Sequence, residues 1–167
     1  MSDVIVRELI DREAIKELKA RYCRFVDQQQ WERLRGLFAP DTRFDGFNSA
    51  PAGSTVDQFI AGISARFVGV VSIHHVHSPE IAFTGSNSAR GIWPMMDYLQ
   101  FPPTAVMKEA PGMRGFVGYG HYEEEYVRTA EGWRFSLLRL TRIRIDPLGP
   151  DLPPVQRGML MADPSWL

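Results

Sequence analysis

Apolar residues between positions 5 and 26 recur every three or four residues, which predicts an amphipathic helix with one buried face. The same spacing predicts a second, shorter helix over 31–38. A third helix is expected over 56–67, because Thr55 and Gln58 have the spacing of a capping box at its start. The first part of the chain is therefore predicted to be helical.

After residue 70 the chain changes to long stretches rich in β-branched and aromatic residues, which predict strands. The long strands are expected at 71–83, 88–101, 116–129 and 132–146. A short strand is expected at 42–47, where apolar and polar residues alternate. Turn sequences at 84–87 and 129–132 favour hairpin connections. Helices followed by a meander of long, twisted strands predict an α+β fold. We expect a cone-shaped α+β barrel, with three N-terminal helices packed against a strongly curved, mostly antiparallel sheet and an apolar interior.

A chain of 167 residues fits one domain, which we place at 1–146. The tail at 147–167 is rich in proline, and we expect it to act as a lid or as a contact between copies. The segment 102–115 is too long for a tight turn and is expected to be a loop or flap.

The composition argues against two classes of binding partner. Lys and Arg number 19 against 20 Asp and Glu, without a basic run, so neither a nucleic acid nor a membrane surface is an expected partner. The single cysteine, Cys23, rules out an internal disulfide and is expected to be a small buried apolar residue. The first residues contain no apolar run typical of a signal peptide or a membrane span, so a cytoplasmic location is expected.

Three of the four histidines occur in the sequence SIHHVHSPEI at 72–81. Strand alternation places His75 and His77 on one face and His74 on the other. With Glu80 and His121, the first two could form part of an iron or zinc site of the cupin type. The leading helices do not belong to that architecture, and we therefore expect no metal.

A histidine becomes an effective general base when a carboxylate orients its ring and stabilises the imidazolium. Asp27, Asp45 and Asp97 are the candidates for this carboxylate. Asp97 lies in an otherwise apolar strand, where it needs a partner unless its side chain points to solvent.

Three segments of the chain resemble, in order and spacing, the SnoaL-like branch of the NTF2-like superfamily: AIKELKARYCRFVDQQQWERLRGLFAPDTRFD, HHVHSPEIAFTGSNSARGIWPMMDYL and GHYEEEYVRTAEGWRFSLLRLTRIRID. This branch includes scytalone dehydratase, bile-acid 7α-dehydratase and hexachlorocyclohexane dehydrochlorinase. The resemblance covers nearly the whole chain to Asp146, and it implies an enzyme that uses no cofactor.

The resemblance also implies roles for particular residues. Asp27 and His74 match an Asp–His pair in which the histidine removes the substrate proton, and Tyr22 and Asp97 match polar groups that hold or protonate a substrate oxygen. If the strand register is one residue off, the base becomes His75.

Two further sets complete the predicted site. An arginine of the last strand often contributes in these enzymes; Arg139, Arg142 and Arg144 are available, and strand parity favours Arg142 or Arg144. The residues expected to line the cavity are His75, His77, Trp93, Phe44, Phe59, Phe67, Met95 and Tyr119.

One geometric condition applies to the Asp–His pair. On an ideal helix, five residues separate Tyr22 from Asp27 by about 140°. We therefore expect the first helix to end or unwind before Asp27.

These features predict a cofactor-independent, dehydratase-like lyase or isomerase. It would use the His74–Asp27 pair to abstract a proton from a hydrophobic cyclic, aromatic or steroid-like small molecule. A non-catalytic binding module and an oligomerisation module of the same fold are the alternatives. A homo-oligomer, either dimer or trimer, is expected because the long sheet has more apolar surface than three helices can cover.

Overall fold

The computed structural model describes residues 2–107, 110–153, 163 and 165–166. Helices form the first part of the described chain, with one strand among them, and strands form the second. The helices are α1 (Ser2–Asp27), α2 (Trp31–Arg35) and α3 (Val56–Arg66). The strands are β1 (Phe38–Asp45), β2 (Val71–Val76), β3 (Glu80–Gly85), β4 (Ser88–Gln100), β5 (Gly115–Thr129) and β6 (Gly132–Leu148).

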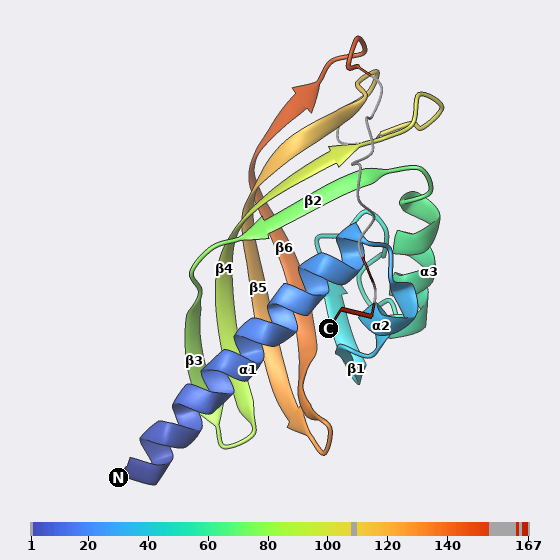
Figure 1. Cartoon of the computed structure of the whole chain (residues 1–167). Coiled ribbons are helices and arrows are strands. Elements are labelled where there is room, and N and C mark those ends of the chain that lie inside the picture. The colour runs from blue at the N-terminus through green and yellow to red at the C-terminus, as the bar shows by residue number, and fades with distance from the viewer. Residues whose placement is uncertain (1, 108–109, 154–162, 164, 167) are drawn as a thin grey trace.

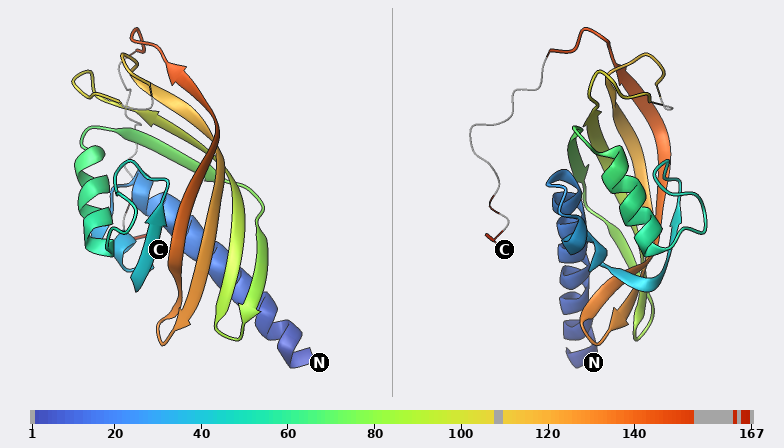
Figure 2. Two further views of the ribbon diagram at one scale, coloured as in Figure 1. Left: turned by 180° about the vertical axis from the view of Figure 1, so that it is seen from behind. Right: turned by 90° about the vertical axis from the view of Figure 1, so that its right-hand side faces the viewer.

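The described strands form one sheet in the order β1-β6-β5-β4-β2, and β3 also pairs with β4. All neighbours are antiparallel except β1, which runs parallel to β6. The long strands β4, β5 and β6 curl strongly, and the helices lie on one face of the sheet, with α1 crossing it diagonally (Figures 1 and 2). The predicted cone-shaped α+β fold is confirmed.

The third helix and both hairpin turns are also confirmed. Thr55 Oγ1 accepts a hydrogen bond from the backbone N–H of Gln58, and Gln58 Oε1 accepts one from the backbone N–H of Thr55. This capping box satisfies two of the N–H groups that the start of a helix leaves without partners.

Two predicted boundaries are wrong. The second helix ends at Arg35, because Phe38 begins β1 and pairs with Phe135 of β6. The strand expected at 71–83 divides into β2 and β3, both of which pair with β4. Pro79 lies in the break and has no N–H to donate to a neighbouring strand.

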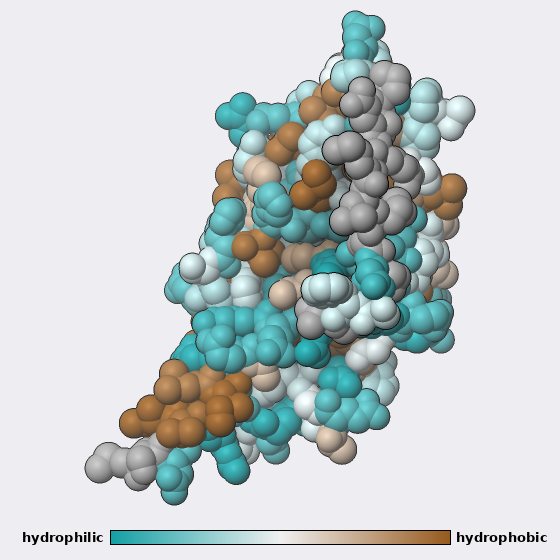
Figure 3. All heavy atoms as spheres, viewed as in Figure 1, coloured by the Kyte–Doolittle hydropathy of each residue, from teal (hydrophilic) through white to brown (hydrophobic). Residues whose placement is uncertain are grey.

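The first two turns of α1 are not buried, contrary to the expectation of one continuous buried face. Ile15 and Val26 are fully buried, whereas Ile5 and Leu9 are 59% and 58% exposed. The N-terminal end of α1 projects beyond the sheet (Figure 1), so the described strands do not cover it. Figure 3 shows a hydrophobic patch over this end of the helix. Its exposed apolar residues are Val4, Ile5, Val6, Leu9 and Ile10.

The segments expected to be lids are only partly described. Residues 102–107 and 110–114 form no helix or strand, and β6 extends two residues into the segment assigned to the tail. Gln100 Nε2 donates to the carbonyl of Pro153 at 3.3 Å, which brings the start of the tail against β4. The rest of the lid prediction falls mainly on 154–162, outside the described residues, and remains a prediction, as do the domain boundary and the homo-oligomer.

Two further expectations were that Cys23 is buried and that no segment spans a membrane. Cys23 is 7% exposed, and burial raises the pKa of its thiol to about 11, so the thiol is protonated and unreactive at neutral pH. Within the described part of the chain, no helix is long and apolar enough to cross a membrane.

Candidate active site

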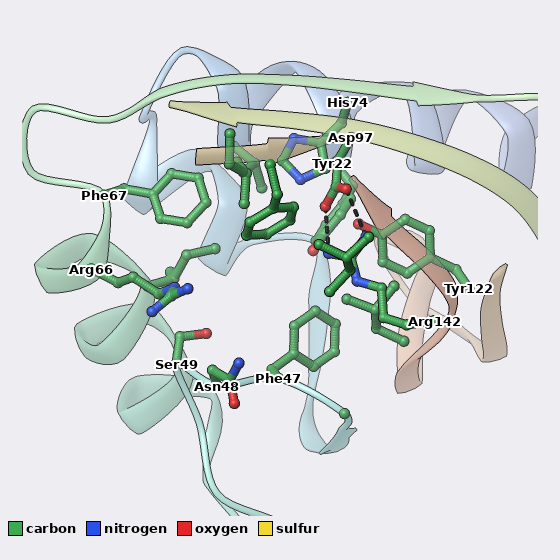
Figure 4. A pocket seen from close by; sticks show the side chains of 17 residues that line it. Tyr22, Phe47, Asn48, Ser49, Arg66, Phe67, His74, Asp97, Tyr122 and Arg142 are labelled. Atoms are coloured by element: carbon green, nitrogen blue, oxygen red, sulfur yellow. Dashed lines mark hydrogen bonds and ion pairs between the residues drawn. The ribbon is translucent and has the colours of Figure 1, made fainter. Parts of the chain in front are cut away.

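Asp27, the last residue of α1, contacts His74 of β2 through both of its carboxylate oxygens. Asp27 Oδ1 lies 2.6 Å from His74 Nδ1 and accepts a second hydrogen bond from Ser72 Oγ at 3.0 Å. Asp27 Oδ2 accepts from the backbone N–H of His74 at 2.8 Å. A carboxylate only accepts hydrogen bonds, so Nδ1 of the imidazole donates, and in the neutral ring Nε2 carries the lone pair. The side chain of His74 is 6% exposed and lines a cavity, toward which its ring points (Figure 4).

The expectation that α1 ends before Asp27 is wrong. The helix continues through Asp27, and β2 passes close enough for the carboxylate of the last turn to reach it. Gln29 follows with a left-handed backbone (φ 55°), and the N–H of Gln30 returns to the carbonyl of Phe25. Gln29 Nε2 donates to the carbonyls of Phe67 and Val70, each at 3.2 Å. These bonds hold the end of α1 against the chain that leads into β2.

Asp97 of β4 lies directly opposite His74 in the strand pairing and is 1% exposed. Arg142 of β6 donates to both of its oxygens, from Nη1 to Oδ1 and from Nη2 to Oδ2, each at 2.6 Å. Bidentate pairs of this kind fix the guanidinium geometry as well as neutralising the charge. The two dashed lines in Figure 4 mark this pair beside His74. Of the arginines considered for the last strand, Arg142 is the one that lines the cavity among the described residues.

Gly118 of β5 makes room for this ion pair. It pairs with Asp97 on one side, and the Arg142 side chain crosses over it from β6. A methyl group at this position would overlap Arg142 Nη1 and Asp97 Oδ1. Glycine is therefore required at position 118 because the ion pair occupies the space that a side chain would need. The backbone conformation of a turn plays no part in this requirement.

Replacing Gly118 by alanine is expected to lower the free energy of unfolding by about 1–3 kcal/mol, because the added methyl displaces a partly buried ion pair. Urea unfolding of both proteins measures the change. Gly149→Ala is the matched control, since a methyl group there meets no atom within 4 Å. Equal stability of Gly118→Ala and the unchanged protein would contradict the assigned role of Gly118.

Two tyrosines place hydroxyl groups in the same wall. Tyr22 of α1 and Tyr122 of β5 are each 1% exposed, and their rings meet edge to face with centroids 5.8 Å apart. Burial raises the pKa of both phenols well above the ordinary value of 10. Both side chains therefore remain neutral O–H donors at physiological pH.

The cavity has a volume of about 230 Å³. An apolar cavity of roughly 150 Å³ is sufficient to hold benzene, so this one fits one or two rings. Its polar residues lie at two ends: His74, Asp97 and Arg142 at one, and Arg66, Ser49 and Asn48 at the other (Figure 4). Most of the remaining wall is hydrocarbon. The apolar side chains of that wall are Val26, Phe47, Ile63, Phe67, Leu99, Phe116, Leu140 and Ile145.

Of the aromatic and sulfur residues expected to form this wall, Phe67 lies in it and four others lie in the adjacent core. Phe44 and Phe59 stack face to face with centroids 4.1 Å apart. Trp93 Nε1 donates to the hydroxyl of Tyr126 at 2.8 Å, and Met95 is 4% exposed. Strand parity correctly predicted an inward direction for Trp93 and Met95, but packed aromatic rings fill the cone at their level.

Four other residues expected at the site point away from it. His75, His77, Tyr119 and Arg144 are exposed, because each lies at a strand position or in a connection that faces outward. Arg144 Nε donates to Asp146 at 2.5 Å on that outer surface. Among the described residues, no group of three or more His, Cys, Asp or Glu side chains could hold a metal ion.

The sequence analysis missed several residues that line the cavity. Phe116 and Tyr122 share the inward face of β5 with Gly118, so strand parity could have identified them. Asn48 and Ser49, in the loop after β1, carried no comparable signal. Arg66 lies in the last turn of the amphipathic helix α3, where its sequence pattern did not distinguish it from a surface arginine.

Comparisons with known proteins identify the family of the chain. Residues 7–139 match the family described as the SnoaL-like domain. A Gibberella zeae protein named "Probable cyclase FGR4" is 26% identical over 141 residues, which cover 77% of this chain and 89% of that protein.

Solved structures show the same architecture. The Kfla4162 protein from Kribbella flavida is 25% identical, with a TM-score of 0.71 over 83% of this chain and 95% of its own. Hexachlorocyclohexane dehydrochlorinase LinA-type3 from Novosphingobium barchaimii LL02 shares the fold at 19% identity, with a TM-score of 0.70 over 89% and 99% of the two chains. The family match, which spans most of the chain, shows that this protein belongs to the SnoaL-like domain family.

Proposed function

We propose that this protein is a cofactor-independent lyase or isomerase in which His74 removes a proton from a carbon atom of a small cyclic substrate. The observation that carries the proposal is the 2.6 Å contact between His74 Nδ1 and Asp27, placed at the wall of a largely apolar cavity. Membership of the SnoaL-like family and similarity to a protein named as a cyclase support the same reaction class.

In this mechanism His74 Nε2 accepts a proton from carbon next to a carbonyl or similar activating group. Asp27 keeps the ring oriented and stabilises the imidazolium that forms. The electron pair moves onto the substrate oxygen, where the neutral hydroxyls of Tyr22 and Tyr122 are placed to donate hydrogen bonds. The guanidinium of Arg142, fixed and neutralised by Asp97, is a further polar group at this side of the cavity. Loss of a leaving group, return of the proton elsewhere or ring closure then completes the reaction.

The size of the cavity narrows the substrate class. Roughly 230 Å³ falls below the 300–1,000 Å³ typical of pockets for drug-sized ligands. A mono- or bicyclic substrate therefore fits better than a steroid, which was among the candidates suggested by the sequence.

The first test uses the bicyclic ketone 2-tetralone in deuterated buffer. We expect the protein to accelerate exchange of the protons next to the carbonyl above the buffer rate, as followed by NMR. Asp27→Asn is expected to reduce this acceleration by about 100-fold, because the imidazole loses its orienting carboxylate. The ¹⁵N shifts of His74 should also change from the Nδ1-protonated tautomer toward a mixture.

Asp41→Asn is the control, because Asp41 is exposed and lies outside the cavity. Exchange by Asp27→Asn at the rate of the unchanged protein would contradict the proposed dyad. Saturable binding of 2-tetralone without any acceleration would favour a binding module instead.

A further inference from the structure

We infer that Ser72 is a positioning residue for the proposed reaction, because its hydroxyl holds the carboxylate of Asp27 in the orientation that His74 requires. This inference rests on the proposed function, since it concerns the efficiency of the same pair of residues. It assigns a role to a residue that neither the spacing of the histidines nor the family resemblance indicated.

Ser72 lies two residues before His74 in β2, so both side chains point to the same face of the strand. Ser72 is 7% exposed. Its hydroxyl donates to Asp27 Oδ1 at 3.0 Å, and the same oxygen lies 2.6 Å from His74 Nδ1. The other oxygen, Oδ2, accepts from the backbone N–H of His74. The strand β2 thus holds the carboxylate at three points, and two of them belong to the residue that the carboxylate has to orient.

Asp27 depends on these contacts because packing alone does not fix its side chain. That side chain is 23% exposed, whereas the side chain of His74 is 6% exposed. Asp27 is also the last residue of α1, and the chain turns directly after it through Gln29, which has a left-handed backbone. Water and other rotamers can therefore compete for the position of the carboxylate. The hydroxyl of Ser72 opposes this competition, and its hydrogen bond does not depend on whether His74 is neutral or charged.

Ser72, Asp27 and His74 are the residue types of a hydrolase triad, but their connections differ from those of a triad. In a triad the serine hydroxyl bonds to one ring nitrogen of the histidine, and the aspartate bonds to the other. Here the hydroxyl of Ser72 donates to the aspartate. Ser72 is also not among the described residues that line the cavity. Its place therefore suits the orientation of Asp27 and does not suit attack on a substrate.

The test replaces Ser72 by alanine in the full chain and follows the exchange of 2-tetralone protons by NMR over a range of ketone concentrations. We expect the rate at saturating 2-tetralone to fall about tenfold, the scale of one hydrogen bond to a charged group. The KM should not change, because Ser72 is outside the described lining of the cavity. The ¹⁵N shifts of His74 should move part of the way from the Nδ1-protonated tautomer toward a mixture.

Thr42→Val is the matched control, because it also removes one buried hydroxyl. Thr42 is 4% exposed, and its Oγ1 lies 2.6 Å from the carbonyl oxygen of Ala39 and 2.7 Å from that of Phe135. Thr42 likewise does not belong to the described lining of the cavity. Both variants should unfold at a slightly lower temperature than the unchanged protein. Only Ser72→Ala should lose exchange rate and alter the ¹⁵N shifts of His74.

Four results would each overturn the inference. The first is an exchange rate of Ser72→Ala equal to that of the unchanged protein, and the second is an equal loss of rate in Thr42→Val. The third is an effect of Ser72→Ala that is confined to KM. The fourth is a His74 tautomer that stays the same in Ser72→Ala.

The ¹⁵N measurement separates this inference from the proposed function, because it needs no activity. If the unchanged protein does not exchange 2-tetralone, the proposed function fails, but a tautomer change in Ser72→Ala would still support the orientation of Asp27 by Ser72. If exchange depends on His74 and Ser72→Ala is equally fast, the proposed function stands and the role of Ser72 fails.

Discussion

His74→Gln is expected to lower the catalysed exchange of 2-tetralone protons by about 10²–10⁴, the usual contribution of a positioned general base. Glutamine keeps a polar side chain of similar length but has no basic nitrogen at neutral pH. The loss should therefore appear in the rate rather than in stability, and NMR exchange rates together with thermal unfolding separate the two.

His75→Gln provides an internal control for that experiment. The two histidines are adjacent in β2, but His75 is exposed while the side chain of His74 is 6% exposed and contacts Asp27. His75→Gln should exchange 2-tetralone at the rate of the unchanged protein. If the two substitutions lowered the rate equally, His74 would not be the base.

Lys19→Met is expected to destabilise the protein by about 3–5 kcal/mol, the typical cost of leaving a buried charge without its partner. Lys19 Nζ lies 2.5 Å from Glu124 Oε1, and both side chains are 0% exposed. The ammonium also lies 3.3 Å from the centre of the Tyr122 ring. Removal of the cation leaves the Glu124 carboxylate in the core beneath the cavity, and urea unfolding measures the loss.

The loss of stability in Lys19→Met should depend on pH. Burial already raises the pKa of Glu124, and Lys19 opposes that shift, so Lys19→Met raises the pKa of Glu124 further. A carboxyl group whose pKa is raised by folding contributes most stability below its unfolded pKa, near 4.5, and this contribution is lost as pH rises through the folded value. The deficit of Lys19→Met should thus be small near pH 4 and should grow as pH rises toward neutrality.

The double variant Lys19→Met/Glu124→Gln tests that explanation. It has no buried charge at this position, and the glutamine oxygen can still accept a hydrogen bond from Tyr126. Stability of the double variant should change much less with pH. A deficit in Lys19→Met that is constant from pH 4 to 7 would attribute the loss to packing instead of charge.

Local patterns in the sequence determined the class of fold. Apolar residues spaced with a period of 3.6 predicted that the first part of the chain is helical. The capping box at Thr55 predicted the start of α3, and the turn sequences predicted two hairpins. These features depend on neighbours within a few residues of the chain, which is why they can be read without the structure. Predicted boundaries were wrong where a residue pairs with a distant strand. Phe38 has the spacing of the second helix, but it pairs with Phe135 and begins β1 instead.

The candidate site was predicted in part, through family resemblance and strand parity. The pair of Asp27 and His74 came from the resemblance, and the choice of Arg142 was left open between neighbouring arginines. Parity gives the direction of a side chain but not its depth in the cone. Trp93 and Met95 point inward at a level that other rings already fill, so they support the cavity without lining it.

The sequence by itself determined the α+β class of the fold, and the family resemblance that it carries predicted the pairing of Asp27 with His74. Only the tertiary structure decided that Asp97 meets Arg142 over Gly118, that Lys19 is buried against Glu124, and that Arg66 faces His74 across the cavity. The two ion pairs join residues 45 and 105 positions apart in the chain. Their existence depends on the curl of the sheet and the close packing of α3, and no local pattern encodes either one.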